Sequence, residues 1–217
     1  MAYKCIIFDC DGVLVDSESI SAKIFQQMAK EVGFEMDFET AVDQFAGASM
    51  PENLKFIQEN IKGDLPKDFE KEFRSRTYQA FKTDLKPVDG IHDLVNKVKV
   101  PFCVASSGPV KKIRLNLTIT KLIQKFEGRI FSSYEVGSWK PEPGIFLHAA
   151  KAMGFSPNEC VVVEDSGAGI KAAIAGGFNV YALAKKKNKS TFKQLGAIVV
   201  TDIGELENKL RDKKILN

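Results

Sequence analysis

Apolar residues follow two patterns along the chain, short continuous runs and a spacing of three and four positions, and each pattern occupies its own stretches of sequence. The first run, Cys5 to Phe8, consists of four consecutive apolar residues. Further short runs centred on apolar residues occupy positions 101–105, 129–132, 160–163, 179–183 and 197–200. Short continuous apolar runs are typical of strands that are buried on both faces, as in the middle of a parallel sheet. Six strands are therefore predicted.

Between the later strands the apolar residues are spaced by three and four positions, which is the period of a helix with one buried face. The segments with this spacing are residues 91–98, 110–117, 122–126, 143–153, 168–175 and 203–211. Strands that alternate with helices build a parallel sheet covered by helices. The expected fold class is therefore α/β, with a doubly wound parallel sheet as its core.

Residues 17–86 follow a different pattern, because helical spacing continues there without a predicted strand. Helices are predicted over residues 19–32, 38–45 and 51–61, and a fourth begins between residues 64 and 68 and ends near residue 85. An insertion of this length can form a core of its own. The expected domains are an α/β domain from residues 1–16 and 87–217 and an all-helical domain from residues 17–86.

Composition narrows the class of protein. Of the 217 residues, 44% are hydrophobic and 27% charged, which fits an ordinary soluble globular protein. The net charge of +3 is too small to indicate a nucleic-acid partner, and no apolar run approaches the roughly 18 to 20 residues of a membrane span. Because the first predicted strand begins at residue 5, we expect no signal peptide, and the four cysteines lack metal-binding spacing. We expect a reduced, cytoplasmic monomer that binds neither nucleic acid nor membranes.

Polar side chains able to do chemistry follow four of the predicted strands. The first strand is followed by Asp9 and Asp11, the second by Ser106 and Ser107, the third, after a few residues, by Lys140, and the fourth by Glu164 and Asp165. Ligands of parallel sheets bind outside the carboxyl ends of the strands, so these side chains are expected to meet. An Asx turn at a strand end would also account for the two aspartates. The joint position of four such loops at one edge favours a functional site.

These residue types suit phosphate chemistry. Asp9, Asp11 and Asp165 offer the hard oxygen ligands that Mg²⁺ prefers. Ser106, neighbouring backbone N–H groups and Lys140 could hold phosphate oxygens. An aspartate carboxylate can accept a phosphoryl group. Hydrolysis of a phosphate monoester needs up to about 10²¹-fold acceleration, so a nucleophile, a metal, a lysine and an acid acting together match the demand.

The same residues carry a family resemblance that extends over the whole chain. The motifs are Asp9-Cys-Asp11-Gly-Val-Leu-Val-Asp16, Ser106 after a strand, Lys140-Pro-Glu-Pro, and Glu164-Asp165-Ser-Gly-Ala-Gly169. In this order they are similar to the four motifs of the haloacid dehalogenase superfamily. The helical insertion resembles the type 1 cap of that superfamily. The subgroup it most resembles holds β-phosphoglucomutase, 6-phosphogluconate phosphatase and related sugar-phosphate phosphatases.

The resemblance implies a role for each matched residue. Asp9 would be the nucleophile that forms an aspartyl-phosphate, and its carboxylate would also bind the metal. Asp11 would be the general acid and then the base, and its backbone carbonyl would contact the metal. Asp165 would be a direct Mg²⁺ ligand and Glu164 a direct or water-mediated one. Ser106, Ser107 and Lys140 would bind the transferring phosphoryl group.

One departure from the family pattern bears on the reaction. The loop at residues 45–51 resembles the specificity loop of β-phosphoglucomutase, but Met50 stands where that family has an arginine for a second phosphate. A methionine cannot bind a phosphate in this way. We therefore expect a Mg²⁺-dependent phosphatase acting on a small phosphorylated metabolite, such as a sugar or sugar-acid phosphate.

Three alternatives stay open on the sequence alone. The first is a phosphosugar mutase of the β-phosphoglucomutase type. The second is a binding or regulatory protein that keeps the fold without turnover. The third is a haloacid dehalogenase, which is less favoured because Asp11 and the acidic residues expected to bind a metal suit a phosphate substrate better. The identity of the substrate cannot be read from the sequence.

Several other features have a structural explanation as well as a functional one. Arg74 and Arg76 could reach the substrate or form a solvated face, and Trp139 could stack on the substrate or pack inside the protein. Residues 185–189 hold four lysines and are expected to form a solvated loop. Cys10 is expected to be a small buried filler, and His92 and His148 to lie on helices without a functional role.

Overall fold

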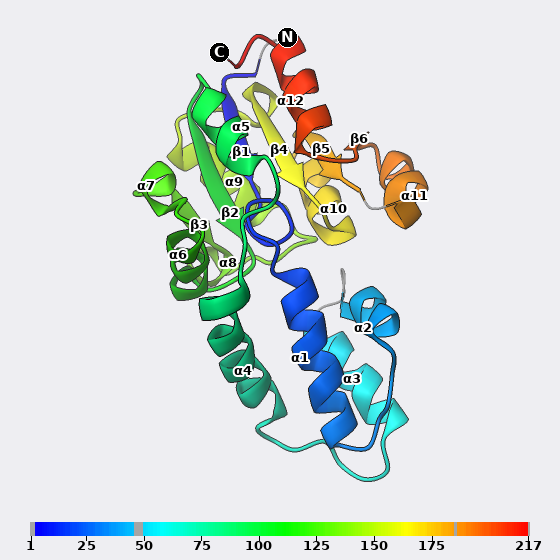
Figure 1. Ribbon diagram of the computed structural model, residues 1–217. Coiled ribbons are helices and arrows are strands. Elements are labelled where there is room, and N and C mark those ends of the chain that lie inside the picture. Colours follow the sequence, from blue (N-terminus) through cyan, green and yellow to red (C-terminus); the bar gives the residue numbers. More distant parts are fainter. Residues whose placement is uncertain (1–2, 46–49, 185, 217) are drawn as a thin grey trace. The chain divides into compact units, whose positions relative to one another are not determined.

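The computed structural model describes residues 3–45, 50–184 and 186–216, and these include a six-stranded sheet (Figure 1). All the strand pairs are parallel, and the strands lie side by side in the order β3-β2-β1-β4-β5-β6. The strands are β1 (Cys5–Phe8), β2 (Phe102–Ser106), β3 (Ile130–Ser132), β4 (Cys160–Glu164), β5 (Asn179–Leu183) and β6 (Ile198–Val200).

This strand order places a topological switch point beside β1. From β1 the chain first builds outward through β2 and β3, and then returns to the other side of β1 to build β4, β5 and β6. The crevice at such a point, outside the carboxyl ends of the strands, is where open α/β sheets bind ligands. The register pairs Phe8 with Val104 on one side and with Val163 on the other. The residues that follow β1 and β4 therefore leave the sheet next to each other.

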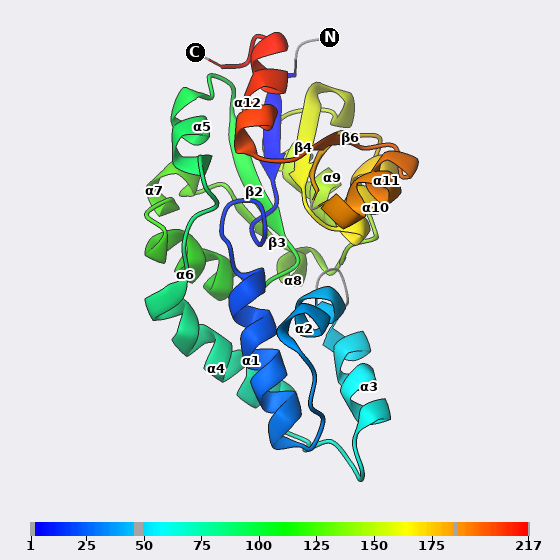
Figure 2. The ribbon, with the colours of Figure 1, turned by 45° about the vertical axis from the view of Figure 1, so that its right-hand side comes forward.

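Helices cover both faces of the sheet (Figure 2). They are α5 (Ile91–Lys97), α6 (Val110–Ile119), α7 (Ile123–Phe126), α8 (Ser133–Val136), α9 (Gly144–Ala152), α10 (Gly167–Ala175), α11 (Lys189–Gln194) and α12 (Ile203–Asp212). Short 3-10 helices lie at Pro157–Glu159 and Lys186–Asn188. Among the described residues no helix combines the length and the apolar content needed to cross a bilayer.

Each face of the sheet has its own apolar layer. On one face, α9 and α10 pack Phe146 and Ile170 against Ile7, Val162 and neighbouring side chains of the central strands. On the other face, the rings of Phe8, Phe102 and Phe126 meet edge to face at centroid distances of 5.2 to 6.2 Å. Alternate residues of a strand point to opposite faces, so the continuous apolar run of β1 fills both layers.

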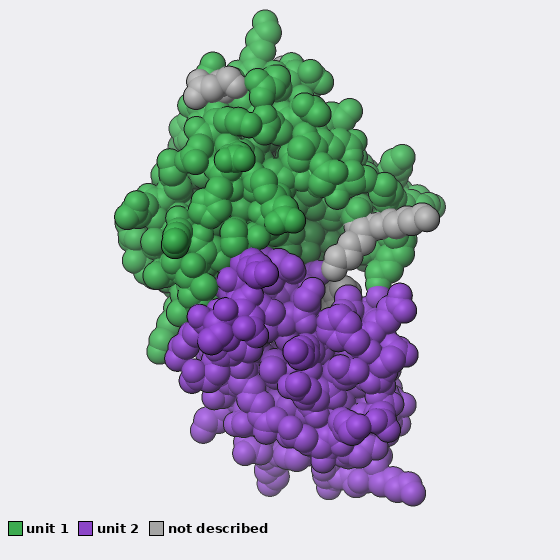
Figure 3. Space-filling view, viewed as in Figure 1, with its two compact units in different colours: residues 1–15, 87–217 green, residues 16–86 purple. Residues whose placement is uncertain are grey.

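The chain divides into two compact units, Met1–Val15 with Pro87–Asn217, and Asp16–Lys86 (Figure 3). The first crossing lies between Val15 and Asp16, one residue before the expected boundary. Val15 bridges Pro87 within the α/β unit, whereas the N–H of Asp16 donates to the carbonyl of Lys86 within the helical unit, at 2.9 Å. This pairing on both sides of the crossing explains the one-residue difference.

The helical unit contains α1 (Glu18–Glu31), α2 (Phe38–Phe45), α3 (Met50–Asn60) and α4 (Phe69–Asp84). The residues 46–49, which include Gly47 and most of the loop that resembles a specificity loop, lie outside the described residues. Phe25, Ile57 and Phe73 form the centre of an apolar cluster, and Phe25 and Phe73 meet edge to face at 6.2 Å. Met50 is partly buried against the same cluster. This unit therefore has a hydrophobic core of its own.

The α/β fold class, the parallel sheet and the helical insertion expected from the sequence are confirmed. The prediction of a solvated loop at 185–189 was wrong for most of its length, because a 3-10 helix occupies Lys186–Asn188 and α11 begins at Lys189. Phe192 is the buried residue of α11. A single apolar residue among lysines shows no helical spacing, so the sequence pattern did not predict α11. Residue 185 lies outside the described residues.

Candidate active site

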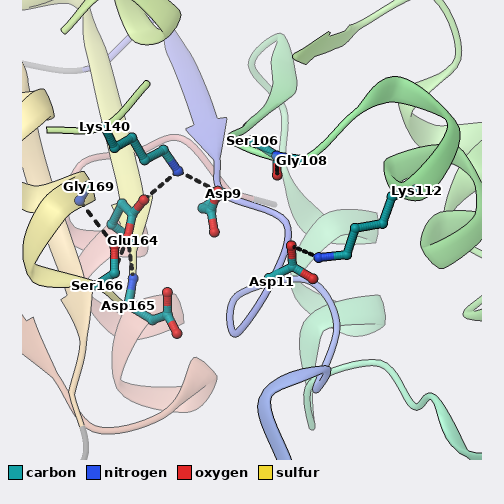
Figure 4. A network of polar contacts seen from close by, with 10 residues as sticks. All are labelled: Asp9, Asp11, Ser106, Gly108, Lys112, Lys140, Glu164, Asp165, Ser166 and Gly169. Carbon is teal, nitrogen blue, oxygen red and sulfur yellow. Dashed lines mark hydrogen bonds and ion pairs between the residues drawn. The ribbon is translucent and has the colours of Figure 1, made fainter. Parts of the chain in front are cut away.

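The candidate site lies at the switch point, at the carboxyl ends of β1 and β4 (Figure 4). Asp9 follows the last residue of β1, and its N–H donates to the carbonyl of Val163 at 2.9 Å. Glu164 ends β4 and Asp165 follows it. Asp9 and Glu164 are buried, while Asp165 is partly exposed. Parallel pairing of two central strands thus brings together carboxylates that are more than 150 residues apart in the sequence.

Lys140 joins two of these carboxylates from the loop between α8 and α9. Its Nζ lies 2.5 Å from Oδ1 of Asp9 and 2.6 Å from Oε1 of Glu164, and its side chain is 6% exposed. A buried ammonium between two buried carboxylates is compensated by both of them. Lys140 is therefore fixed beside the position at which Asp9 would react.

Glu164 is held on both of its oxygens. Its Oε1 accepts a hydrogen bond from Nζ of Lys140. Its Oε2 accepts hydrogen bonds from the N–H groups of Asp165 and Ser166, both at 2.8 Å, and from Oγ of Ser166 at 2.9 Å. A Cβ at Gly169 would lie 1.8 Å from Oε1, so the first turn of α10 leaves room for Glu164 only because residue 169 is glycine. This network explains the order Glu164-Asp165-Ser-Gly-Ala-Gly169.

The carboxylates of Asp9, Glu164 and Asp165 offer oxygens that all lie within 4.8 Å of one another. Such a set of hard, anionic oxygens fits Mg²⁺, which takes few protein ligands and keeps several waters. Gly12 supports the same set. It has φ +75°, and a Cβ there would lie 1.8 Å from Oδ2 of Asp165. The donor chemistry and the space kept for Asp165 both fit a divalent cation.

The side chain of Asp11 points away from this group. Its Oδ2 accepts a hydrogen bond from Nζ of Lys112 at 2.7 Å (Figure 4). Its Oδ1 accepts one from Nδ2 of Asn116 at 3.3 Å. Both partners come from α6, and neither was predicted from the sequence. They are four positions apart, so one helix face presents both. That spacing was a usable signal, but it does not name a partner about 100 residues away. The role of the Asp11 backbone carbonyl stays a prediction.

Ser106 ends β2 and is buried, and its Oγ accepts a hydrogen bond from the N–H of Gly108 at 3.1 Å. Oγ of Ser132, at the end of β3, donates to the carbonyl of Gly108 at 2.7 Å. The loop after β2 is thus fixed from two strands. Ser107 lies in this loop and is partly exposed. The predicted phosphate-binding residues Ser106, Ser107 and Lys140 all belong to the same unit and the same sheet edge.

Burial and charge alter the ionisation of the site. Burial raises the pKa of Asp9 to about 7; Lys140 opposes this rise, and the neighbouring Glu164 and Asp11 add to it. The pKa of Lys140 is raised by Asp9 and Glu164, which outweigh the opposing effect of its burial. Burial and then the charges of Asp11 and Asp9 raise the pKa of Cys10 well above its usual value. The Cys10 thiol is therefore neutral and buried, which fits the predicted filler.

Other residues considered from the sequence have defined contacts. Trp139 is 45% exposed and meets Tyr134 edge to face at 5.4 Å, within the α/β unit. In the helical unit, Arg74 pairs with Glu70, and Arg76 pairs with Glu31 and Glu72. Nε2 of His92 lies 2.8 Å from the carbonyl of Thr120, and His148 packs on Phe131. These contacts suffice to explain the two histidines.

Comparison with known proteins identifies the family. Residues 3–177 match the family of haloacid dehalogenase-like hydrolases. The chain is 32% identical over 188 residues to 6-phosphogluconate phosphatase of Escherichia coli, covering 86% of this chain and 85% of that protein. It is 29% identical over 186 residues to hexitol phosphatase A of the same organism, with 84% of each chain covered.

Solved structures agree with these relatives. A haloacid dehalogenase-like protein of unknown function from Agrobacterium tumefaciens superimposes with a TM-score of 0.89 at 30% identity, covering 98% of this chain and 99% of that one. A hydrolase of the same family from Deinococcus radiodurans, solved with bound phosphate and sodium, gives a TM-score of 0.85 at 27% identity and covers 100% and 98% of the two chains. The chain therefore belongs to the haloacid dehalogenase-like hydrolases.

Proposed function

We propose that this protein is a Mg²⁺-dependent phosphatase that hydrolyses a small phosphorylated metabolite, a sugar or sugar-acid phosphate, through an aspartyl-phosphate. The observation that carries the proposal is the group formed at the switch point by the buried side chains of Asp9, Lys140 and Glu164 and the partly exposed Asp165. The relatives support the same enzyme class, phosphoric monoester hydrolases, since they include phosphatases of phosphogluconate and of hexitols. The phosphate bound in the Deinococcus structure supports a phosphate site in this fold.

The proposed reaction has two steps. In the first, a carboxylate oxygen of Asp9 attacks phosphorus, the bond from phosphorus to the ester oxygen breaks, and Asp11 gives its proton to the leaving alcohol. In the second, Asp11 takes a proton from water as the water oxygen attacks phosphorus, and the acyl-phosphate bond breaks to return the Asp9 carboxylate and inorganic phosphate.

Other residues would neutralise and hold the phosphoryl group. An ammonium has three N–H donors, and the one of Lys140 that bonds neither Asp9 nor Glu164 can point to a phosphoryl oxygen. Ser106 and the loop N–H groups would hold a second oxygen. Asp9, Glu164, Asp165 and the backbone carbonyl of Asp11 would hold Mg²⁺, which when bound would offset the charge that develops on the transferring oxygens.

Met50 favours a phosphatase over a mutase. A phosphosugar mutase must bind two phosphates, and Met50 has no donor for either one. Its side chain instead packs against the apolar core of the helical unit. The non-catalytic alternative is disfavoured because the paired lysine, the nucleophile position and the acidic cluster are all present together. We also propose that the protein is cytoplasmic, on the basis of four free cysteines, all buried. A monomer is the default expectation.

The test is release of free phosphate from a panel of sugar phosphates, polyol phosphates, nucleotides, pyrophosphate and p-nitrophenyl phosphate. We expect turnover with Mg²⁺, loss of turnover with a chelator, and a loss of at least about 10³-fold in kcat for Asp9→Asn. Asp93→Asn is the matched control, because Asp93 is exposed on α5. Undiminished turnover by Asp9→Asn would exclude the proposed nucleophile. Interconversion of two sugar phosphates without phosphate release would establish the mutase instead.

A further inference from the structure

Two residues of α6, Lys112 and Asn116, contact Asp11 but have no role in the reaction proposed above. Lys112 and Asn116 each reach a different oxygen of the Asp11 carboxylate, at 2.7 and 3.3 Å. Two donors, one on each oxygen, restrict rotation of the carboxylate about χ2 more than either donor alone would. The direction in which Asp11 points is thus set by one turn of α6.

Asn116 is placed for this contact at a cost to its own hydrogen bonding. Its side chain is fully buried, and Oδ1 has no hydrogen-bond partner among residues 3–45, 50–184 and 186–216, while Nδ2 donates to Asp11. Buried polar groups in proteins are nearly always paired, and an exception calls for an explanation. An apolar side chain would fill the space without leaving an acceptor unpaired. The contact with Asp11 is the feature that explains an amide here.

Lys112 also ties Asp11 to the phosphate loop. Its Cδ is 3.3 Å from the position that a Cβ at Gly108 would take, and Oγ of Ser106 is 3.5 Å from the same point. The aliphatic part of Lys112 therefore crosses the loop after β2 before its ammonium reaches Asp11. The segment from Ser106 to Asn116 would then hold both the phosphoryl group and the group that moves the proton.

We propose that Lys112 and Asn116 are positioning residues that orient the Asp11 carboxylate for proton transfer. This inference rests on the proposed function, in which Asp11 acts in both steps. A small displacement of a catalytic group costs up to about 10²-fold in rate. Loss of either donor should therefore slow those steps in which Asp11 moves a proton and spare the others.

The test compares two aryl phosphates that differ in the acidity of the leaving group. p-Nitrophenolate departs from p-nitrophenyl phosphate without a proton, whereas the more basic phenolate of phenyl phosphate needs one. For Lys112→Met we expect kcat/KM to fall by about 10- to 100-fold with phenyl phosphate and by no more than about threefold with p-nitrophenyl phosphate. The value of kcat/KM reports formation of the phosphoenzyme, so the later water attack does not obscure this difference.

Rapid mixing with p-nitrophenyl phosphate gives a second readout. In Lys112→Met, formation of the phosphoenzyme stays fast, but the water attack that needs Asp11 is slow. We therefore expect a burst of p-nitrophenolate that approaches one equivalent of enzyme and exceeds that of the unchanged protein. Lys112→Arg, which keeps a cationic donor, should restore part of the rate.

Two further variants separate positioning from charge and folding. Lys111→Met removes the same charge from an exposed side chain on the same helix turn and should leave both substrates unaffected. Asn116→Leu removes the other donor without changing charge and should give the same selective loss as Lys112→Met. Equal losses for the two substrates in both variants, or no loss in either, would overturn the inference alone. Absence of phosphate release by the unchanged protein would overturn the proposed function as well.

Discussion

Gly12 lies against the proposed metal site and leaves the space that one of its carboxylates, Asp165, occupies. Its φ of +75° is in the left-handed region, and a Cβ there would overlap Oδ2 of Asp165. Gly128 has nearly the same φ, +73°, but a Cβ there would meet nothing within 4 Å. The two glycines therefore share the backbone requirement and differ in what a side chain would displace.

We expect Gly12→Ala and Gly128→Ala each to lose about 1 to 2 kcal/mol of stability, because alanine in the left-handed region is strained. Gly12→Ala alone should also weaken Mg²⁺ binding, by at least about tenfold, since Asp165 must move away from Asp9 and Glu164. Urea unfolding and calorimetric Mg²⁺ titration measure the two effects. Equal Mg²⁺ affinity in the two variants would show that Asp165 does not bind the metal.

The ionisation of Asp9 gives a dependence of stability on pH. In the unfolded chain its carboxyl ionises near 3.8, whereas in the folded protein burial raises its pKa to about 7. Between these values the folded state holds the proton more tightly, so the contribution of Asp9 to stability is full below about pH 4 and declines as pH rises toward 7. Above about pH 7 Asp9 is ionised in both the folded and the unfolded state, so its effect on stability no longer changes with pH.

Asp9→Asn removes this titration while keeping an oxygen that can accept from Lys140. In the presence of a chelator we expect the variant to gain stability over the unchanged protein as pH rises from 4 to 7. The shift from 3.8 to about 7 sets an upper limit of about 4 kcal/mol at 1.36 kcal/mol per unit. Urea unfolding at several pH values measures the difference. A difference that stays constant or shrinks with pH would show that Asp9 is ionised in the folded state throughout this range.

At the scale of elements, the apolar runs predicted the six strands, because the central strands are buried on both faces and consist mainly of apolar residues. Asp9, which follows β1, and Ser106 and Glu164, which end β2 and β4, could be assigned to one edge since parallel strands share a direction. The short helix α8, with its N-cap at Ser132, and α11, with Phe192 as its buried residue, were not predicted. A single turn, or a helix with one apolar contact, carries no period that a pattern can reveal.

The contacts of α6 could not be predicted for a different reason. The pattern over residues 110–117 correctly predicts a helix, and its buried residues include Ile113 and Leu117. The same pattern suggests that Lys112 lies near the solvent boundary. Its pairing with Asp11 depends on how α6 packs beside the loop after β1, which is a tertiary arrangement. Sequence reasoning therefore found the carboxylates of the site but not the residues that orient one of them.

For the whole molecule, the two units have separate apolar cores, and this leads to a prediction about their stability. Phe25 is fully buried in the helical unit, so Phe25→Ala should cost that unit about 3 to 5 kcal/mol. Hydrogen exchange should then increase in residues 16–86, while protection of the sheet and its Mg²⁺ affinity stay unchanged. Phe38→Ala, at a side chain that is 45% exposed in the same unit, is the control and should change little. A similar loss of protection across both units would show that they unfold together.

The central place of β1 in the sheet also has a consequence for the growing chain. During synthesis β1 is made before all the other strands, yet both of its neighbours come much later, β2 ending at Ser106 and β4 at Glu164. At ribosomal rates of about 5 to 20 residues per second, roughly 8 to 31 s pass between Phe8 and Glu164. During this time α1 to α4 can form through local contacts, whereas β1 has both edges open until β2 is made and one edge open until β4 is made. The strand that positions Asp9, the proposed nucleophile, is thus the one that stays exposed longest to chaperones and to aggregation.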